Sequence, residues 1–210
     1  MDIKDLFLAF EKRRKFNQEI KERIALRCMD FIGAGNEIFL GAGTTVSFLG
    51  EYLAQSDRHF MMKIWTNNIF ILNLWLKKYE GFFLENFVGI VSGEISRKNL
   101  SIVDIHFDFS RIGKVIIGSP GISAKGLSSD DIHTVQQIEH VIKRAEEVII
   151  LADSFKIGRE CTYQTRSMRM IKIDMRKKKR YTLITNGSRE EVYRKTIKKL
   201  KENGMNIVQV

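Results

Sequence analysis

The chain has 210 residues, of which 44% are hydrophobic, and a formal net charge of +10. This length fits one medium α/β domain with a substantial core, and no apolar run is long enough to span a bilayer. The two cysteines lie far apart and show no metal-ligand or redox spacing. We therefore expect a cytosolic protein with reduced thiols, no secretory signal and no metal site.

The positive charge is concentrated in the last quarter of the chain. Residues 1–31 hold 8 basic and 6 acidic residues, residues 32–155 hold 11 and 14, and residues 156–210 hold 16 and 5. The corresponding net charges are +2, −3 and +11. The densest part, residues 176–180, holds no aromatic residue, which favours a solvated turn between two short strands. Nucleic-acid binding through this quarter is the alternative.

Helix and strand patterns alternate along the chain. Apolar residues near a 3.6-residue period predict one amphipathic helix over residues 2–31. The patterns that follow predict strands at 38–40, 60–65, 87–91, 115–117, 148–151, 170–173, 181–185 and 206–210. Helices are predicted at 44–55, 68–79, near 100–109, at 132–146 and at 188–202. Residues 118–131 are expected to form a long loop, and residues 154–170 have only a weak pattern.

Short, continuously apolar strands that alternate with helices are typical of a mostly parallel sheet covered by helices on both faces. We expect a single domain over 1–210, with an N-terminal helix (1–32), a core (33–187), and a C-terminal helix and strand (188–210). Ligands of such sheets bind at the carboxyl ends of the strands. Polar breaks fall at these ends and predict one shared site, formed by residues 41–45, 66–68, 92–93, 118–123 and 153–158.

The most informative segment reads Ile-Phe-Leu-Gly-Ala-Gly-Thr-Thr-Val-Ser and covers residues 38–47. Gly41 and Gly43 allow a backbone to approach a ligand closely. Thr44 and Thr45 open a helix, whose N-terminus presents unpaired N–H groups and a partial positive charge. A phosphate, a sugar phosphate or a carboxylate suits such a site. The alternative is a plain strand-to-helix turn in which Thr44 is the N-cap.

The polar breaks, taken in this order, resemble the C-terminal effector-binding domain of the DeoR family of bacterial transcriptional repressors. The resemblance covers about residues 9–187 and rests on Phe10–Arg13, Ile38–Thr45, Trp65–Asn68, Val91–Glu94, Ile117–Ser123, Gly126–Ser128, Ile150–Gly158 and Leu183–Thr185. It implies the Rossmann-like fold shared by ribose-5-phosphate isomerase and the coenzyme A transferases. It also implies a homo-oligomer that needs no cofactor and binds a phosphorylated sugar, which relieves repression.

The resemblance also assigns residues to the ligand. The phosphate-binding and ligand-binding set that it implies is Gly41, Gly43, Thr44, Thr45, Thr66, Asn67, Asn68, Gly121 and Lys156. Backbone N–H groups, hydroxyls and a lysine suit a phosphate dianion, because charge-assisted hydrogen bonds are stronger than neutral ones. The alternatives are a surface role for Lys156 and a helix-cap role for the two asparagines.

The chain also departs from the family pattern. The repressors carry a winged helix-turn-helix before the sensor, whereas here the sensor's first helix begins almost at the first residue, so DNA contact is expected only through a missing or separate domain. The family usually has an acidic residue at Gly41, two glycines at Ser92 and Gly93, and Asp at Asn186. The ligand can therefore differ from those of relatives.

A sugar-phosphate isomerase is the alternative function. Isomerisation needs a general base near a carbon-bound proton, and the nearest candidates are Asp130, Asp131 and His133. Ribose-5-phosphate isomerases carry an Asp-Gly-Ala-Asp-type motif where this chain has Gly-Ser-Pro-Gly at 118–121. Two aspartates after Ser129 are also typical of a helix N-terminus. We therefore expect a ligand sensor without catalytic residues.

Overall fold

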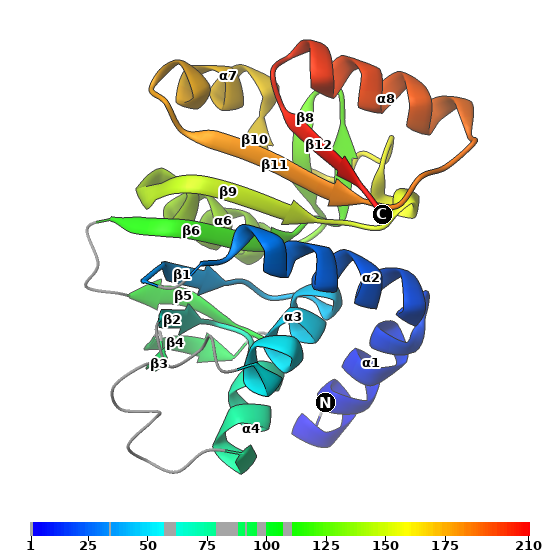
Figure 1. Cartoon of the computed structure of the whole chain (residues 1–210). Coiled ribbons are helices and arrows are strands. Elements are labelled where there is room, and N and C mark those ends of the chain that lie inside the picture. The colour runs from blue at the N-terminus through cyan, green and yellow to red at the C-terminus, as the bar shows by residue number, and fades with distance from the viewer. Residues whose placement is uncertain are drawn as a thin grey trace.

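The computed structural model describes residues 2–33, 35–56, 62–78, 88–90, 92–95, 100–106 and 111–210. Its centre is a seven-stranded sheet in the order β12-β11-β9-β6-β1-β2-β3 (Figure 1). All neighbouring strands of this sheet pair in parallel, which confirms the expected sheet. The strands are β1 (Glu37–Leu40), β2 (Lys63–Thr66), β3 (Val88–Ile90), β6 (Ile112–Gly118), β9 (Ala145–Leu151), β11 (Arg180–Thr185) and β12 (Asn206–Gln209).

Helices cover both faces of this sheet. One face packs against α2 (Gln18–Cys28), α3 (Thr44–Gln55) and α4 (Ile69–Lys78). The other face packs against α6 (Ile132–Arg144), α7 (Met168–Arg176) and α8 (Glu191–Glu202). Because the central strands are buried on both sides, they read as continuous apolar runs rather than as alternating ones. The expected doubly covered α/β fold is confirmed.

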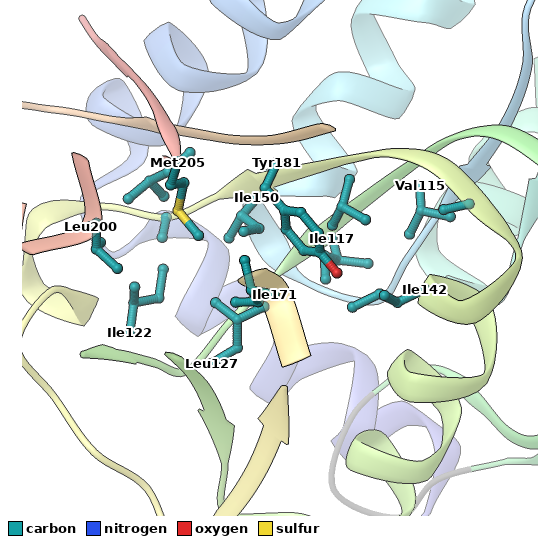
Figure 2. Packing of buried hydrophobic residues seen from close by; sticks show 14 of the residues in the cluster. Val115, Ile117, Ile122, Leu127, Ile142, Ile150, Ile171, Tyr181, Leu200 and Met205 are labelled. Carbon is teal, nitrogen blue, oxygen red and sulfur yellow. The ribbon is translucent and has the colours of Figure 1, made fainter. Parts of the chain in front are cut away.

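The core under α6, α7 and α8 joins three helices to the middle of the sheet. Figure 2 shows Val115, Ile117 and Ile150 of the sheet packing with Ile142 of α6 and Ile171 of α7. Each of these side chains is at most 1% exposed. Burying an aliphatic side chain of this size stabilises the fold by about 1.5–3 kcal/mol. This core holds the carboxyl ends of β6 and β9 in place.

The direction of the chain reverses between β1 and β6. From β1 the chain continues through α3 to β2 and then through α4 towards β3, whereas from β6 it continues through α6 to β9 on the other side. The two connections therefore diverge beyond the carboxyl ends of β1 and β6. Such a switch point leaves a crevice at the strand ends, where open α/β sheets bind their ligands.

The N-terminal segment differs from the single helix predicted over 2–31. It forms α1 (Ile3–Lys15), α2 and a short 3₁₀ segment, η1 (Met29–Phe31), and the break lies at Asn17. Asn17 has a φ of 53°, a left-handed conformation that asparagine tolerates better than most residues. Arg14 fixes α1 on α3, since its guanidinium lies 3.7 Å from the Phe48 ring centroid and its Nε donates to Ser47 Oγ at 3.1 Å. The helix pair is thereby folded over the strand ends.

Two further predictions are wrong. The short helix near 100–109 is strand β5 (Ile102–His106), which pairs antiparallel with β4 (Ser92–Ile95). The loop over 118–131 is a hairpin of β7 (Gly121–Ser123) and β8 (Gly126–Ser129), to which β10 (Tyr163–Ser167) adds. The strands predicted at 60–65 and 87–91 correspond to β2 and β3, and residues 60, 61, 87 and 91 lie outside the described residues, as do 107–109.

The strand predicted at 170–173 is also wrong, because these residues belong to α7. Ser167 caps this helix by accepting a hydrogen bond from the Met170 N–H at 3.2 Å. The basic run over residues 176–180 therefore joins helix α7 to strand β11, rather than joining two strands. Within the described part of the chain, no helix has the length and the apolar character that crossing a membrane requires.

Candidate functional site

The turn after β1 places the start of α3 at the switch point. The Gly41 N–H donates to the Ile116 carbonyl at 2.8 Å, which ties the turn to β6. A Cβ on Gly41 would lie 2.9 Å from Ile117 Cγ2, so a side chain there would require Ile117 of β6 to shift. Gly43, rather than Thr44, is the N-cap of α3, and its φ is 135°. Glycine has no side chain to cap the helix, so the first-turn N–H groups of α3 remain available to an anion.

A cavity of about 680 Å³ opens over this turn. It is bounded by the corner between α1 and α2, by the carboxyl ends of β1, β6 and β9, and by α6. Its polar lining comprises Lys12, Arg13, Lys21, Gly41, Gly43, Thr44, Thr45, Asn67, Ser119, Ser129, Asp130, Asp131, Thr134, Gln137, Asp153, Lys156 and Arg159. The volume lies within the ~300–1,000 Å³ that small-molecule sites occupy.

Three groups of the ligand-binding set lie together in this cavity. They are the glycine–threonine turn with Gly41, Gly43, Thr44 and Thr45, then Asn67, and then Lys156. Lys156 ends the 3₁₀ segment η3 (Ser154–Lys156) that follows β9. Strands β1, β2 and β9 carry these groups to one edge of the sheet. The parallel order of the strands brings them together.

The other three residues of the set lie behind the cavity wall. Thr66 Oγ1 donates to the Leu40 carbonyl at 2.8 Å and accepts from the Asn68 N–H at 3.0 Å. Asn68 Nδ2 donates to the carbonyls of Gly41 and Gly43 at 3.4 and 3.3 Å. These two side chains hold the glycine turn in shape. Gly121 starts β7, where a Cβ would lie 2.5 Å from Ser128 Oγ, and it does not line the cavity.

Lys21 is a cation of the site that the sequence reasoning missed. It lies on α2, is only 5% exposed, lines the cavity and donates a hydrogen bond to the Arg13 carbonyl. Burial lowers the pKa of Lys21 to about 8, while Asp153 raises it and Lys156 lowers it. The sequence does carry a signal, because Lys21 shares the buried face of its helix with Ile24, Ala25 and Cys28. A lysine in an apolar stripe marks a buried charge.

Two residues that line this cavity each carry a buried oxygen with no hydrogen-bond donor among the described residues. Asp153 is 3% exposed and Asn67 is 1% exposed, and both line the cavity. Among the described residues, nothing donates a hydrogen bond to Asp153 Oδ1 or to Asn67 Oδ1. An unmet buried acceptor costs roughly 1–3 kcal/mol. A hydrogen-bond donor that reached either oxygen would remove this cost.

The candidate acid–base residues are engaged in other interactions. Thr134 Oγ1 donates to Asp131 Oδ2 at 2.7 Å at the start of α6. Asp130 accepts from the Thr162 N–H and hydroxyl, both at 3.0 Å, and these bonds lower the pKa of its carboxyl. His133 does not line the cavity. Among the described residues, no group of three His, Cys, Asp or Glu side chains is arranged to hold a metal ion.

Comparison with known proteins assigns the family. Residues 16–175 match the model of the DeoR C-terminal sensor domain. The chain belongs to this family. The match covers the glycine turn, β9 and the Asp153–Lys156 segment, and of the residues that line the cavity only Phe10, Lys12 and Arg13 precede it.

Curated relatives of the sensor domain are repressors. The chain is 28% identical to the glycerol-3-phosphate regulon repressor of Escherichia coli (strain K12) over 165 residues, which are 76% of this chain and 62% of that protein. It is also 28% identical to the lactose phosphotransferase system repressor of Staphylococcus epidermidis over 158 residues, which are 71% of this chain and 58% of that protein. The chain thus spans about three-fifths of the length of these relatives.

Solved structures that resemble the sensor domain are ribose 5-phosphate isomerases. The enzyme from Methanocaldococcus jannaschii aligns with a TM-score of 0.49 and 16% identity, over 67% of this chain and 54% of that one. The enzyme from Plasmodium falciparum aligns with a TM-score of 0.47 and 16% identity, over 68% and 52%. At this identity and with TM-scores under 0.5, neither likeness assigns a chemistry to this chain.

Proposed function

We propose that the sensor domain binds a phosphorylated sugar or polyol in the switch-point cavity, does not convert it, and serves as the effector-binding part of a DeoR-type transcriptional regulator. One observation carries the proposal. The lining of a single cavity combines the N-terminus of α3, three lysines, and two residues with buried oxygens that have no donor among the described residues. The first two features suit an anion, and the third suits hydroxyl groups.

The polar groups suggest how the ligand would be oriented. The phosphate would lie at Gly43–Thr45, where helix N–H groups and the partial positive charge of α3 favour a dianion. Lys21 and Lys156 would add charge-assisted hydrogen bonds, worth roughly 1.5–3 kcal/mol each. The hydroxyl groups would then reach Asp153 and Asn67. One repressor relative is named for glycerol 3-phosphate, which is a phosphorylated polyol.

The same geometry argues against turnover. A general base works best when its pKa lies near the operating pH. Hydrogen bonds from Thr162 lower the pKa of Asp130 instead, and Thr134 occupies one oxygen of Asp131. Neither carboxyl group is poised to remove a proton from carbon. We therefore rank binding without chemistry above the isomerase alternative.

A thermal-shift screen tests the proposal. The panel comprises glycerol 3-phosphate, pentose and hexose phosphates, the same molecules without phosphate, and inorganic phosphate. A ligand at about 100 times its Kd should stabilise the protein by about 2.7 kcal/mol. We expect a phosphorylated sugar or polyol to stabilise more than either of its halves. No response across the panel would contradict the proposal, and conversion of a bound ligand would favour the isomerase alternative.

A matched pair of threonine variants locates the ligand. Thr45→Val removes a hydroxyl that lines the cavity, and Thr165→Val removes a hydroxyl on β10 that has no hydrogen-bond partner among the described residues. Both threonines are buried. We expect Thr45→Val to weaken binding roughly 10-fold or more, since a hydrogen bond to a charged group is lost. Thr165→Val should bind the ligand as the wild type does. Equal affinity of the two variants would show that the ligand does not bind at the glycine–threonine turn.

A further inference from the structure

Most of the positive charge in residues 156–210 lies outside the ligand site, because only Lys156 and Arg159 of these residues line the cavity. Helices that connect parallel strands begin near the carboxyl ends of the strands and end at the opposite edge of the sheet. The carboxyl ends of α7 and α8 therefore lie at the edge away from the cavity, and they lie side by side (Figure 1). A Cβ on Gly204, just after α8, would lie 3.4 Å from Met175 Cε of α7.

In the basic run after α7, residues 177–180, some side chains have partners within the protein and others do not. The Lys179 ammonium donates to the carbonyls of Ile142 and Lys143 at the end of α6. Arg180 pairs with Glu147 at 2.8 Å. Lys177 and Lys178 follow the last residue of α7 and remain exposed. Lys179 and Arg180 thus have partners within the protein, although the Arg180 side chain is 71% exposed, whereas Lys177 and Lys178 are exposed and form no ion pair among the described residues.

Further cations continue this exposed surface on both helices. On α7, Lys172 and Arg176 are exposed one turn apart. On α8, Lys199 and Lys201 are exposed in the last turn, while Leu200 between them packs into the core (Figure 2). We define the basic ridge as Lys172, Arg176, Lys177, Lys178, Lys199 and Lys201. Across the described part of the chain, no acidic side chain forms an ion pair with any of the six.

Stabilisation of the helices explains only some of the cations of the basic ridge. Cations in the last turn interact favourably with the helix macrodipole, which explains Arg176, Lys199 and Lys201. Lys177 and Lys178 lie beyond the helix, and neighbouring like charges repel one another. Repulsion from Lys177 contributes to the lowered pKa of Lys179, after the larger effect of burial. Such a concentration of unpaired charge attracts a polyanion.

We propose that the basic ridge contacts the phosphate backbone of duplex DNA. Among the described residues, no exposed large hydrophobic side chain lies within 171–180 or 198–204, whereas the centre of a protein–protein interface is typically rich in aromatic and apolar residues. Lysine and arginine without aromatic neighbours also provide no platform for stacking single-stranded bases. The contact is therefore electrostatic and independent of sequence. Because the ridge and the ligand cavity lie at opposite edges of the sheet, DNA and the effector can be bound together.

Fluorescence anisotropy of a labelled duplex of arbitrary sequence, titrated at several salt concentrations, tests this contact. For Z neutralised phosphates, log K falls with log salt at a slope of about −0.9Z, so the six cations give a slope of up to about −5. Lys177→Glu combined with Lys178→Glu should weaken binding at least tenfold at about 50 mM salt and flatten the slope by roughly 2. The α8 pair, Lys199→Glu with Lys201→Glu, should act in the same way.

A charge-matched variant separates the ridge from net charge alone. Lys4→Glu with Lys15→Glu changes the charge equally, but on exposed residues of α1. It should lose less than threefold in affinity. The proposal is overturned if the wild type does not bind the duplex at about 50 mM salt, or if the α1 variant loses as much as the ridge variants. It is also overturned if the ridge variants change only self-association in sedimentation, which would assign the ridge to a second copy of the chain. A melting curve for each variant verifies folding, and two separate ridge pairs keep the test decisive.

Discussion

Exchanging Lys21 for Met is expected to stabilise the unliganded protein and to weaken effector binding. Lys21 is 5% exposed, and burial lowers its pKa from 10.5 to about 8. Folding thus brings an ammonium group from water into surroundings that disfavour its charge. Methionine has nearly the same length, adapts to irregular space and carries no charge. The substitution therefore removes an electrostatic cost without opening a large hole.

The size and the pH dependence of the gain follow from the pKa. The difference between 10.5 and about 8 corresponds to about 3 kcal/mol. The ammonium retains a hydrogen bond to the Arg13 carbonyl, so we expect a gain of about 1–3 kcal/mol in the free energy of unfolding at pH 7. Between pH 8 and 10.5 the unfolded chain binds more protons than the folded one, so the wild type gains stability as pH rises through this window. The advantage of the variant is full below pH 8 and disappears near pH 10.5.

Urea denaturation at pH 7 and pH 10 measures the stability of each protein, and calorimetric titration with a phosphorylated sugar measures binding. Losing one charge-assisted hydrogen bond should weaken binding by roughly 10- to 150-fold. Lys15→Met, on the exposed end of α1, should change stability by less than about 0.5 kcal/mol. The reasoning is refuted if Lys21→Met destabilises the protein at pH 7, if its advantage does not depend on pH, or if its affinity equals that of the wild type.

Three further substitutions address the turn and the core. Gly43→Ala should lower the free energy of unfolding by about 1–3 kcal/mol and weaken anion binding, because φ is 135° there. Gly187→Ala is the control, since a Cβ there has open space, and it should leave stability in urea denaturation unchanged. Asp174→Asn should cost about 1–3 kcal/mol by thermal denaturation, because it removes one of the two carboxylates that pair with the buried Arg166, the one at 2.7 Å, and leaves Glu139 at 2.9 Å; full stability would show that the pair with Asp174 is dispensable. Thr66→Val should cost about 1–3 kcal/mol in urea denaturation, because it removes two buried hydrogen bonds, and an unchanged midpoint would contradict the assigned role.

Much of the fold was predictable from local pattern. A strand buried on both faces must be apolar throughout, so runs such as Val148–Leu151 indicate a parallel sheet. Helices between such strands then follow from the crossover that parallel pairing requires. The glycine–threonine turn was predictable for the same reason, since a strand end followed by glycine and a helix start is a local feature. These inferences need only neighbouring residues.

Local pattern failed where one segment fits two structures. Residues 170–173 alternate in a way that suits a strand, yet Ile171 and Met168 also share one face of a helix. The cap at Ser167 and the packing of Ile171 against the sheet select the helix. The segment 118–131 was predicted as a loop, whereas its short strands pair with each other, with β10 and, at Ile122, with Ile157. Pairing between distant segments leaves little trace in a single sequence.

For the candidate site, the sequence by itself determined which chemical groups are present: glycines that bare the backbone, hydroxyls at a helix start, and a lysine after β9. Only the tertiary structure decided which other residues lie next to these groups. A left-handed Asn17 breaks the first helix and folds Lys21 over the cavity, and the packing of β1 against β2 turns Thr66 and Asn68 into supports for the turn. The physical reason is that the sequence gives the residue types of a site, whereas which residues become neighbours in space depends on how distant helices and strands pack together.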